Sequence, residues 1–149
     1  DTQISNLSFI YKWTPASQNK QQLTLLSEYF YLKDDGDLSI EDELASYDGK
    51  QYGGFVEGVY QFAPRWRTGV RYDYLGSSLS ASDNELLDDA GLDYSGYHPK
   101  RYGLMLEWMP SEFSRIRAQI NHDKASRDAD TQFILQYTVS LGAHGAHSY

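Results

Sequence analysis

Apolar and polar residues alternate along most of the chain, which is the pattern of a β-strand with one apolar face. Seven segments show this alternation, at residues 6–15, 22–32, 52–62, 66–74, 102–109, 114–122 and 131–141. In the last of them Phe133, Leu135 and Tyr137 share one face, opposite Gln132 and Gln136. Apart from a possible short turn of helix within 38–46, no amphipathic helical pattern is present. The sequence therefore predicts an all-β, antiparallel protein with about seven strands.

The connections between these segments alternate in length. Short turns follow the first, third and fifth strands, and long polar segments, 34–50 and 77–99, follow the second and fourth. Within them, 34–49 and 80–96 hold 12 of the 21 acidic residues and no lysine or arginine, so we expect loops. Outer-membrane barrels have this asymmetry, with short periplasmic turns and longer extracellular loops. A transmembrane β-barrel domain over 1–149, with extracellular loops 34–50 and 77–99, is the prediction.

Aromatic residues support that prediction by lying near strand ends, where membrane barrels carry aromatic girdles. They are Trp13, Tyr31, Trp66, Tyr74, Tyr102 and Trp108. A soluble antiparallel barrel or sandwich, with its apolar face turned inward, is the alternative.

Composition narrows the class of protein. The 149 residues suit one domain, with 40% hydrophobic residues and a mean hydropathy of -0.61. No apolar run approaches the roughly 20 residues of a membrane helix, whereas barrel strands need only about 9–11. The net charge of -8 argues against a nucleic-acid partner. The absence of cysteine fits the oxidising bacterial envelope, and also many cytosolic proteins.

Strand parity carries a further expectation. If the long loops are extracellular, the first strand begins outside the cell, whereas complete bacterial barrels start and end in the periplasm with an even strand number. We expect the chain to be the C-terminal portion of a larger barrel, completed by upstream strands or another chain. A complete eight-stranded barrel, with one further strand in 34–50 or 80–97, is the alternative.

The tail "QYTVSLGAHGAHSY" resembles the C-terminus of a family of proteobacterial porin-like outer-membrane proteins of the zinc-regulated type, which end in Gly-Ala-His-x-Ala-His-x-aromatic. The resemblance covers about ten residues. It implies a larger barrel, of which this chain forms the last strands, and passage of small solutes or metal across the outer membrane. It departs from many barrels in that residues 142–148 interrupt the alternation before Tyr149.

Charged residues on the polar side of the strands are the candidate pore lining, because opposed charges in a lumen select polar solutes. The set is Lys12, Glu28, Glu57, Arg67, Arg71, Asp73, Glu107, Arg115 and Arg117. The same charges suit a paired network that fills a narrow, non-conducting barrel.

Metal and catalytic motifs are weak. His144 and His147 form an H-x-x-H pair, which supplies two zinc ligands where a closed site needs four. The acidic segments offer oxygen ligands for calcium without the spacing of an EF-hand loop. No cofactor and no enzyme activity are expected, with Asp73 and His122 at the rim as a minor catalytic alternative.

The function predicted is an outer-membrane porin-like channel for small polar solutes or ions, linked to metal uptake. The alternatives are a non-conducting structural or adhesion barrel, and the C-terminal part of an energised receptor of the TonB-dependent type. Expected partners are outer-membrane lipid, lipopolysaccharide, small solutes and further copies of the chain in a homo-oligomer.

Overall fold

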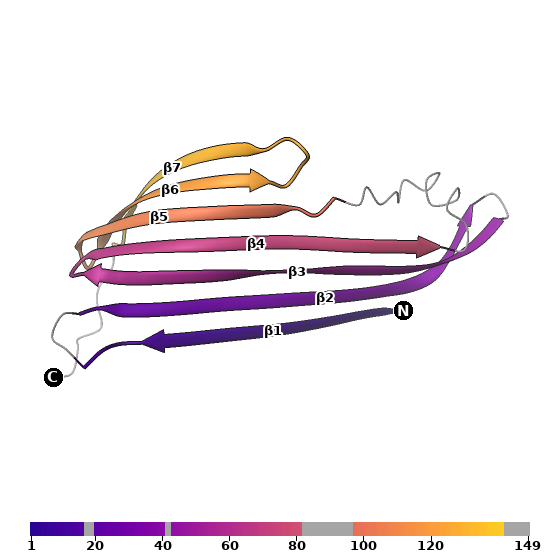
Figure 1. The fold of residues 1–149 in the computed structure, drawn as a ribbon, viewed down its shortest axis with the longest axis horizontal. Coiled ribbons are helices and arrows are strands. Elements are labelled where there is room, and N and C mark those ends of the chain that lie inside the picture. The colour runs from indigo at the N-terminus through magenta and orange to yellow at the C-terminus, as the bar shows by residue number, and fades with distance from the viewer. Residues whose placement is uncertain (17–19, 41–42, 82–96, 142–149) are drawn as a thin grey trace.

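The protein is an all-β chain folded into one antiparallel sheet of seven strands (Figure 1). The computed structural model describes residues 1–16, 20–40, 43–81 and 97–141. The strands are β1 (Thr2–Trp13), β2 (Gln22–Ile40), β3 (Glu43–Ala63), β4 (Trp66–Ala81), β5 (Lys100–Ser111), β6 (Ser114–Lys124) and β7 (Asp130–Val139). Each strand pairs with its neighbours in the sequence, which confirms the predicted class and the seven predicted strands. No helix in the described ranges is long and apolar enough to span a membrane.

The register of the six ladders gives the sheet two chemically different faces. Because side chains alternate along a strand, residues paired across the ladders share a face. The apolar face carries, among others, Phe9, Tyr11, Trp13, Leu25, Tyr29, Tyr31, Tyr52, Val56, Tyr60, Trp66, Val70, Tyr72, Tyr74, Tyr102, Leu104, Leu106, Trp108, Ile116, Ile120, Phe133, Leu135 and Tyr137. The charged face carries Lys12, Glu28, Glu57, Arg67, Arg71, Asp73, Arg101, Glu107, Arg115, Arg117 and Asp123.

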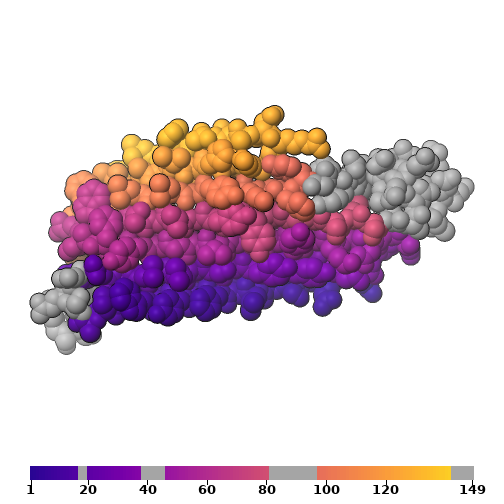
Figure 2. All heavy atoms as spheres, viewed as in Figure 1, coloured from indigo at the N-terminus to yellow at the C-terminus, as the bar shows by residue number. Residues whose placement is uncertain are grey.

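Burial in this sheet is the reverse of burial in a soluble domain. Phe133 and Leu135 are 77% and 79% exposed, whereas Glu107 is 2% exposed and is the largest fully buried side chain among the described residues. Asn121 and Asp123 on the same face are also buried. The space-filling view shows the strands succeeding one another from indigo to yellow across the molecule (Figure 2). The sheet therefore buries two carboxylates, Glu107 and Asp123, half-covers most of the arginines around them, and leaves many rings and aliphatic side chains uncovered.

Both outer strands of the sheet lack a second neighbour within the described chain. All twelve residues of β1 are exposed, and β7 pairs only with β6. An unpaired strand edge presents backbone N–H and C=O groups to any strand that reaches it. The sheet is thus open, with two edges available for pairing.

The short connections agree with the predicted turns. Pro64 and Arg65 join β3 to β4, and the positive φ of Arg65, 71°, after a proline is typical of a type II turn. Between β5 and β6, the hydroxyl oxygens of Ser111 and Ser114 lie 2.7 Å apart across the turn.

The long segment at 34–50 was predicted to be a loop, and this is wrong. β2 and β3 continue through it as a paired hairpin, from Asp34 opposite Gly49 to Ile40 opposite Glu43. Backbone pairing needs no apolar side chains, so the hydrophobic pattern gives no sign of it. This segment lengthens two strands and adds no eighth one. The other predicted loop, 77–99, loses 77–81 to β4, and 82–96 lie outside the described residues.

Polar contacts stabilise residues 34–50 of the β2–β3 hairpin, which we call the distal hairpin. Thr2 donates a hydrogen bond of 2.6 Å to Asp34, and the Tyr47 hydroxyl donates one of 3.1 Å to the same carboxylate. These bonds lower the pKa of Asp34, with the Thr2 bond as the larger cause. Hydrogen bonds from Lys50 and then Lys33 lower the pKa of Asp48.

Two adjacent glycines mark a close approach of the central strands. Gly53 and Gly54 are buried in β3. A Cβ at Gly54 would overlap the carbonyl oxygen of Glu28 in β2, and one at Gly53 would overlap Leu75 in β4. Only glycine lets both neighbouring strands come this near.

We expect Gly54→Ala to destabilise the sheet by about 1–3 kcal/mol, because the methyl group must displace strand backbone. Gly58→Ala is the matched control, since its Cβ would meet Leu25 at an ordinary 3.4 Å. The urea midpoint of the full-length protein in detergent micelles measures the difference. Equal midpoints for the two variants would contradict the close approach.

We also expect the distal hairpin to loosen in acid. A lowered folded pKa means that these carboxylates stabilise the hairpin above the ordinary aspartate pKa of about 4 and lose that contribution as the pH falls through the lowered values. Hydrogen exchange at 46–50, corrected for the intrinsic rate, should accelerate below about pH 4. The double variant Asp34→Asn, Asp48→Asn should already show the faster exchange at neutral pH. Acid-insensitive exchange in the unsubstituted protein would refute this role.

Candidate functional site

The charged face is the candidate site, and its centre is Glu107 on β5. Arg117 on β6 binds this carboxylate through two nitrogens, at 2.8 and 3.1 Å. Arg115 approaches it to 3.5 Å from the same strand, and Arg67 approaches it to 3.8 Å from β4. Three guanidinium groups thus share one carboxylate, so the cluster has an excess of two positive charges.

Secondary hydrogen bonds hold the two outer arginines in place. Nε of Arg67 donates to Gln61 at 3.3 Å, and Nε of Arg115 donates to Thr138 at 3.3 Å. Each bond leaves other nitrogens of the guanidinium free to meet an anion, because arginine has five N–H donors. We call Glu107 with Arg67, Arg115 and Arg117 the arginine cluster.

A second group of charges surrounds Arg71 on β4. Arg71 donates to Asp73 at 2.8 to 3.1 Å and to Glu57 on β3 at 3.4 Å. Its guanidinium carbon lies 3.8 Å from the centre of the Phe55 ring, which places the cation over an aromatic face. Two carboxylates here meet one cation, so this group carries one excess negative charge and differs in sign from the arginine cluster.

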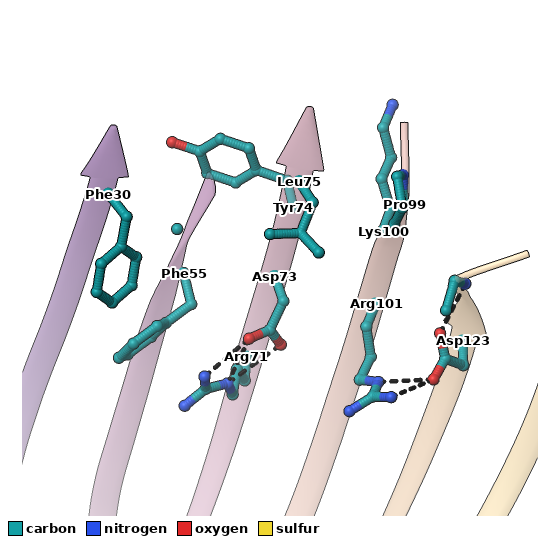
Figure 3. Close-up of a pocket in the computed structure, with 12 residues that line it drawn as sticks. Phe30, Phe55, Arg71, Asp73, Tyr74, Leu75, Pro99, Lys100, Arg101 and Asp123 are labelled. Atoms are coloured by element: carbon teal, nitrogen blue, oxygen red, sulfur yellow. Dashed lines mark hydrogen bonds and ion pairs between the residues drawn. The ribbon is translucent and has the colours of Figure 1, made fainter. Parts of the chain in front are cut away.

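Two of the hollows on this face are lined by its charged residues. The smaller, of 190 Å³, lies between the two groups and is lined by residues of both, including Arg67, Arg71, Glu57 and Glu107. The larger, of 410 Å³, is the one drawn in Figure 3. Its lining includes Phe30, Phe55, Arg71, Asp73, Arg101 and Asp123. The surface therefore combines charged donors and acceptors with an aromatic wall, which suits small polar solutes.

Some of the predicted pore residues contact one another in the two charged groups, and others lie outside these groups. Seven of them form the two groups: Glu57, Arg67, Arg71, Asp73, Glu107, Arg115 and Arg117. Glu28 lies on the same face, where Asn6 and Ser8 donate to it at 3.1 and 3.3 Å. Lys12 lies on β1 opposite Thr24 of β2. It is three strands away from Arg71, which lies on β4.

The structure does not bring Asp73 and His122 together as a catalytic pair. Asp73 lies on the charged face opposite Arg101, whereas His122 lies on the apolar face opposite Tyr102. His122 instead contacts Thr131 through Nδ1 at 3.1 Å. The two side chains point to opposite sides of the sheet and cannot act as a pair.

The predicted metal pair, His144 and His147, lies outside the described residues. Within the described ranges no group of three or more histidine, cysteine, aspartate or glutamate residues is placed to hold a metal ion.

One ion pair on this face was missed by the sequence. Arg101 on β5 binds Asp123 on β6, and the backbone N–H of Ala125 donates to the same carboxylate at 2.8 Å. The alternation pattern could have indicated this pair. Arg101 lies an even number of positions from Glu107 on β5, and Asp123 lies an even number from Arg117 on β6, so all four share the charged face. The fifth strand was predicted to begin two residues too late and the sixth to end two residues too early, so Arg101 and Asp123 lay outside the predicted strands.

We expect Glu107→Gln to destabilise the sheet by about 1–3 kcal/mol, because three arginines lose their shared carboxylate. Glu57→Gln is the matched control, since Arg71 keeps Asp73 when Glu57 is lost. The urea midpoint of the full-length protein reports the difference. An equal loss in both variants would show that Glu107 does not organise the arginine cluster.

Comparisons with known proteins add one relative. An uncharacterized protein of Aquifex aeolicus is 31% identical over 132 residues, which cover 85% of this chain. The matched region makes up 27% of that protein, so the chain spans about a quarter of its relative's length. The chain matches no protein-family model. No solved structure matches it.

Proposed function

We propose that the chain is part of an outer-membrane β-barrel that acts as a porin-like channel for small polar solutes and ions. The observation that carries this proposal is the uneven burial of the sheet: many large apolar side chains are exposed on one face, whereas Glu107 and Asp123 are buried on the other. A barrel in lipid needs this polarity, with apolar side chains outward and polar side chains in the lumen.

The dimensions and order of the apolar face support insertion in a bilayer. On β4 this face runs from Trp66 to Tyr74, nine residues, within the range of about 9–11 that a tilted strand needs to cross. Trp66 stacks on Trp108 at 6.0 Å at one end, and Tyr72 packs against Tyr102 at 5.1 Å near the other. Aliphatic residues lie between these rings, as in a hydrocarbon band with aromatic girdles.

Closure of the barrel requires more strands. A bilayer does not tolerate unpaired backbone groups, so β1 and β7 need partners there. We propose that further strands of a longer chain, or another chain, supply them. The relative, of which the matched region makes up 27%, is compatible with the first source.

The arginine cluster gives the proposed lumen a preference for anions, because its excess positive charge attracts them where water is restricted. The long β2–β3 hairpin and residues 77–99 would face the cell exterior, by analogy with the asymmetry of known barrels. The histidine tail that resembles the zinc-regulated porin family is compatible with a link to metal uptake.

The test is ion conductance of the full-length protein in planar bilayers. We expect the double variant Arg67→Gln, Arg115→Gln to keep conducting, because Glu107 retains Arg117 at 2.8 Å. Its anion-to-cation permeability ratio, taken from the reversal potential in a salt gradient, should fall about fivefold for each arginine removed.

Lys50→Gln is the control, since it removes one positive charge from the apolar face and should leave the permeability ratio unchanged. No conductance from correctly assembled protein would refute the channel and favour a non-conducting barrel. An unchanged ratio in the arginine variant would refute the arginine cluster as the selective element.

A further inference from the structure

Four lysines occupy equivalent places at one end of the apolar face. Each is the next residue on that face beyond the last ring of its strand. Lys33 follows Tyr31 on β2, Lys50 precedes Tyr52 on β3, Lys100 precedes Tyr102 on β5, and Lys124 follows His122 on β6. The register places Lys33 directly opposite Lys50, and Lys100 directly opposite Lys124. Like charges directly opposite one another destabilise a ladder unless an anion lies between them.

The first pair has its anions within the chain. Lys33 lies 3.4 Å from Asp35 and 3.4 Å from Asp48, and Lys50 lies 2.9 Å from Asp48. Asp48 thus bridges the two ammonium groups and relieves their repulsion.

The second pair has no such carboxylate among the described residues. Lys100 and Lys124 are both exposed, and the nearby carboxylate of Asp123 is engaged by Arg101 on the charged face. In Figure 3 the Lys100 side chain extends toward the strand end, away from the Arg71–Asp73 and Arg101–Asp123 pairs. Two cations therefore stand side by side at the edge of the apolar band without a protein counterion in the described ranges.

We propose that Lys100 and Lys124 seat the phosphate of a membrane-lipid headgroup, an inference that rests on the proposed insertion of this face in a bilayer. Directly opposed strand residues have Cβ atoms about 4.5–5.5 Å apart, so one phosphate can accept from both ammonium groups. The lipid's acyl chains would then lie on the aliphatic side chains of β5 and β6, Leu104 and Ile120 among them. A free anion would gain nothing from that apolar surface, which is why we assign the site to a lipid.

The experiment measures lipid bound to the full-length protein by native mass spectrometry after titration with phosphatidic acid or phosphatidylcholine. We expect Lys100→Gln, Lys124→Gln to weaken phosphatidic acid binding about 10- to 30-fold, at about 1 kcal/mol for each lysine. Lys33→Gln, Lys50→Gln is the matched control and should bind phosphatidic acid like the unsubstituted protein. Phosphatidylcholine binding should be the same in all three.

Three results would overturn the inference. The first is equal phosphatidic acid binding by the Lys100, Lys124 variant and the unsubstituted protein. The second is equal binding of phosphatidic acid and phosphatidylcholine by the unsubstituted protein. That result is expected if carboxylates of 82–96 neutralise the lysine pair. The third is displacement of phosphatidic acid by an equal concentration of inorganic phosphate, which would mark a free-anion site. Conductance of each variant in planar bilayers separates this failure from failure of the proposed channel, because a conducting variant with unaltered lipid binding refutes the headgroup site alone.

Discussion

The constraint on which this structure depends is that the six ladders keep the same parity through the body of the sheet. Side chains alternate strictly along a strand, so a slip of one residue between β4 and β5 would put Glu107 beside Thr68 and the Trp108 ring on the face of Arg67. The register shifts only next to the β3–β4 and β5–β6 turns, between Gln61 and Ala63 and between Trp108 and Ser111, and the ladders keep their parity elsewhere in the described sheet. The exposed apolar band and the shielded arginine cluster are therefore two consequences of one register.

The two faces use different cations, for a physical reason. Among the described residues the charged face holds its carboxylates mainly with arginine, whose planar fork binds an oxygen through two nitrogens, as Arg117 does at Glu107. The margin of the apolar face uses lysine, whose apolar stem crosses hydrophobic surface while its ammonium reaches water or a headgroup. The identity of each cation thus matches the solvent that its face would meet in a membrane barrel.

Sequence periodicity was sufficient for the strands and for the membership of each face, because both are local properties. It could not show that Arg67 reaches Glu107 or that Arg71 lies over Phe55, since these contacts depend on how separate strands align. It missed the hairpin through 34–50 because seven of these residues are acidic, and the few apolar ones, such as Leu38 and Ile40, form no long alternation. There the pairing is supported by contacts such as Lys33 with Asp48 and Tyr47 with Asp34, which no single strand reveals.

The strand order has a consequence for how the sheet assembles. Every ladder joins strands that are consecutive in the sequence, so each strand can pair with the preceding one across a single connection, of which the longest is 82–99. Pairing at the two outer edges is the step without such a local route, and it pays the largest loop-closure entropy. Until it occurs, the unpaired edges of β1 and β7 can pair with strands of other chains. The rate of assembly therefore matters as much as the stability of the folded sheet. The two edges must pair with their native partners faster than they pair with another copy of the sheet.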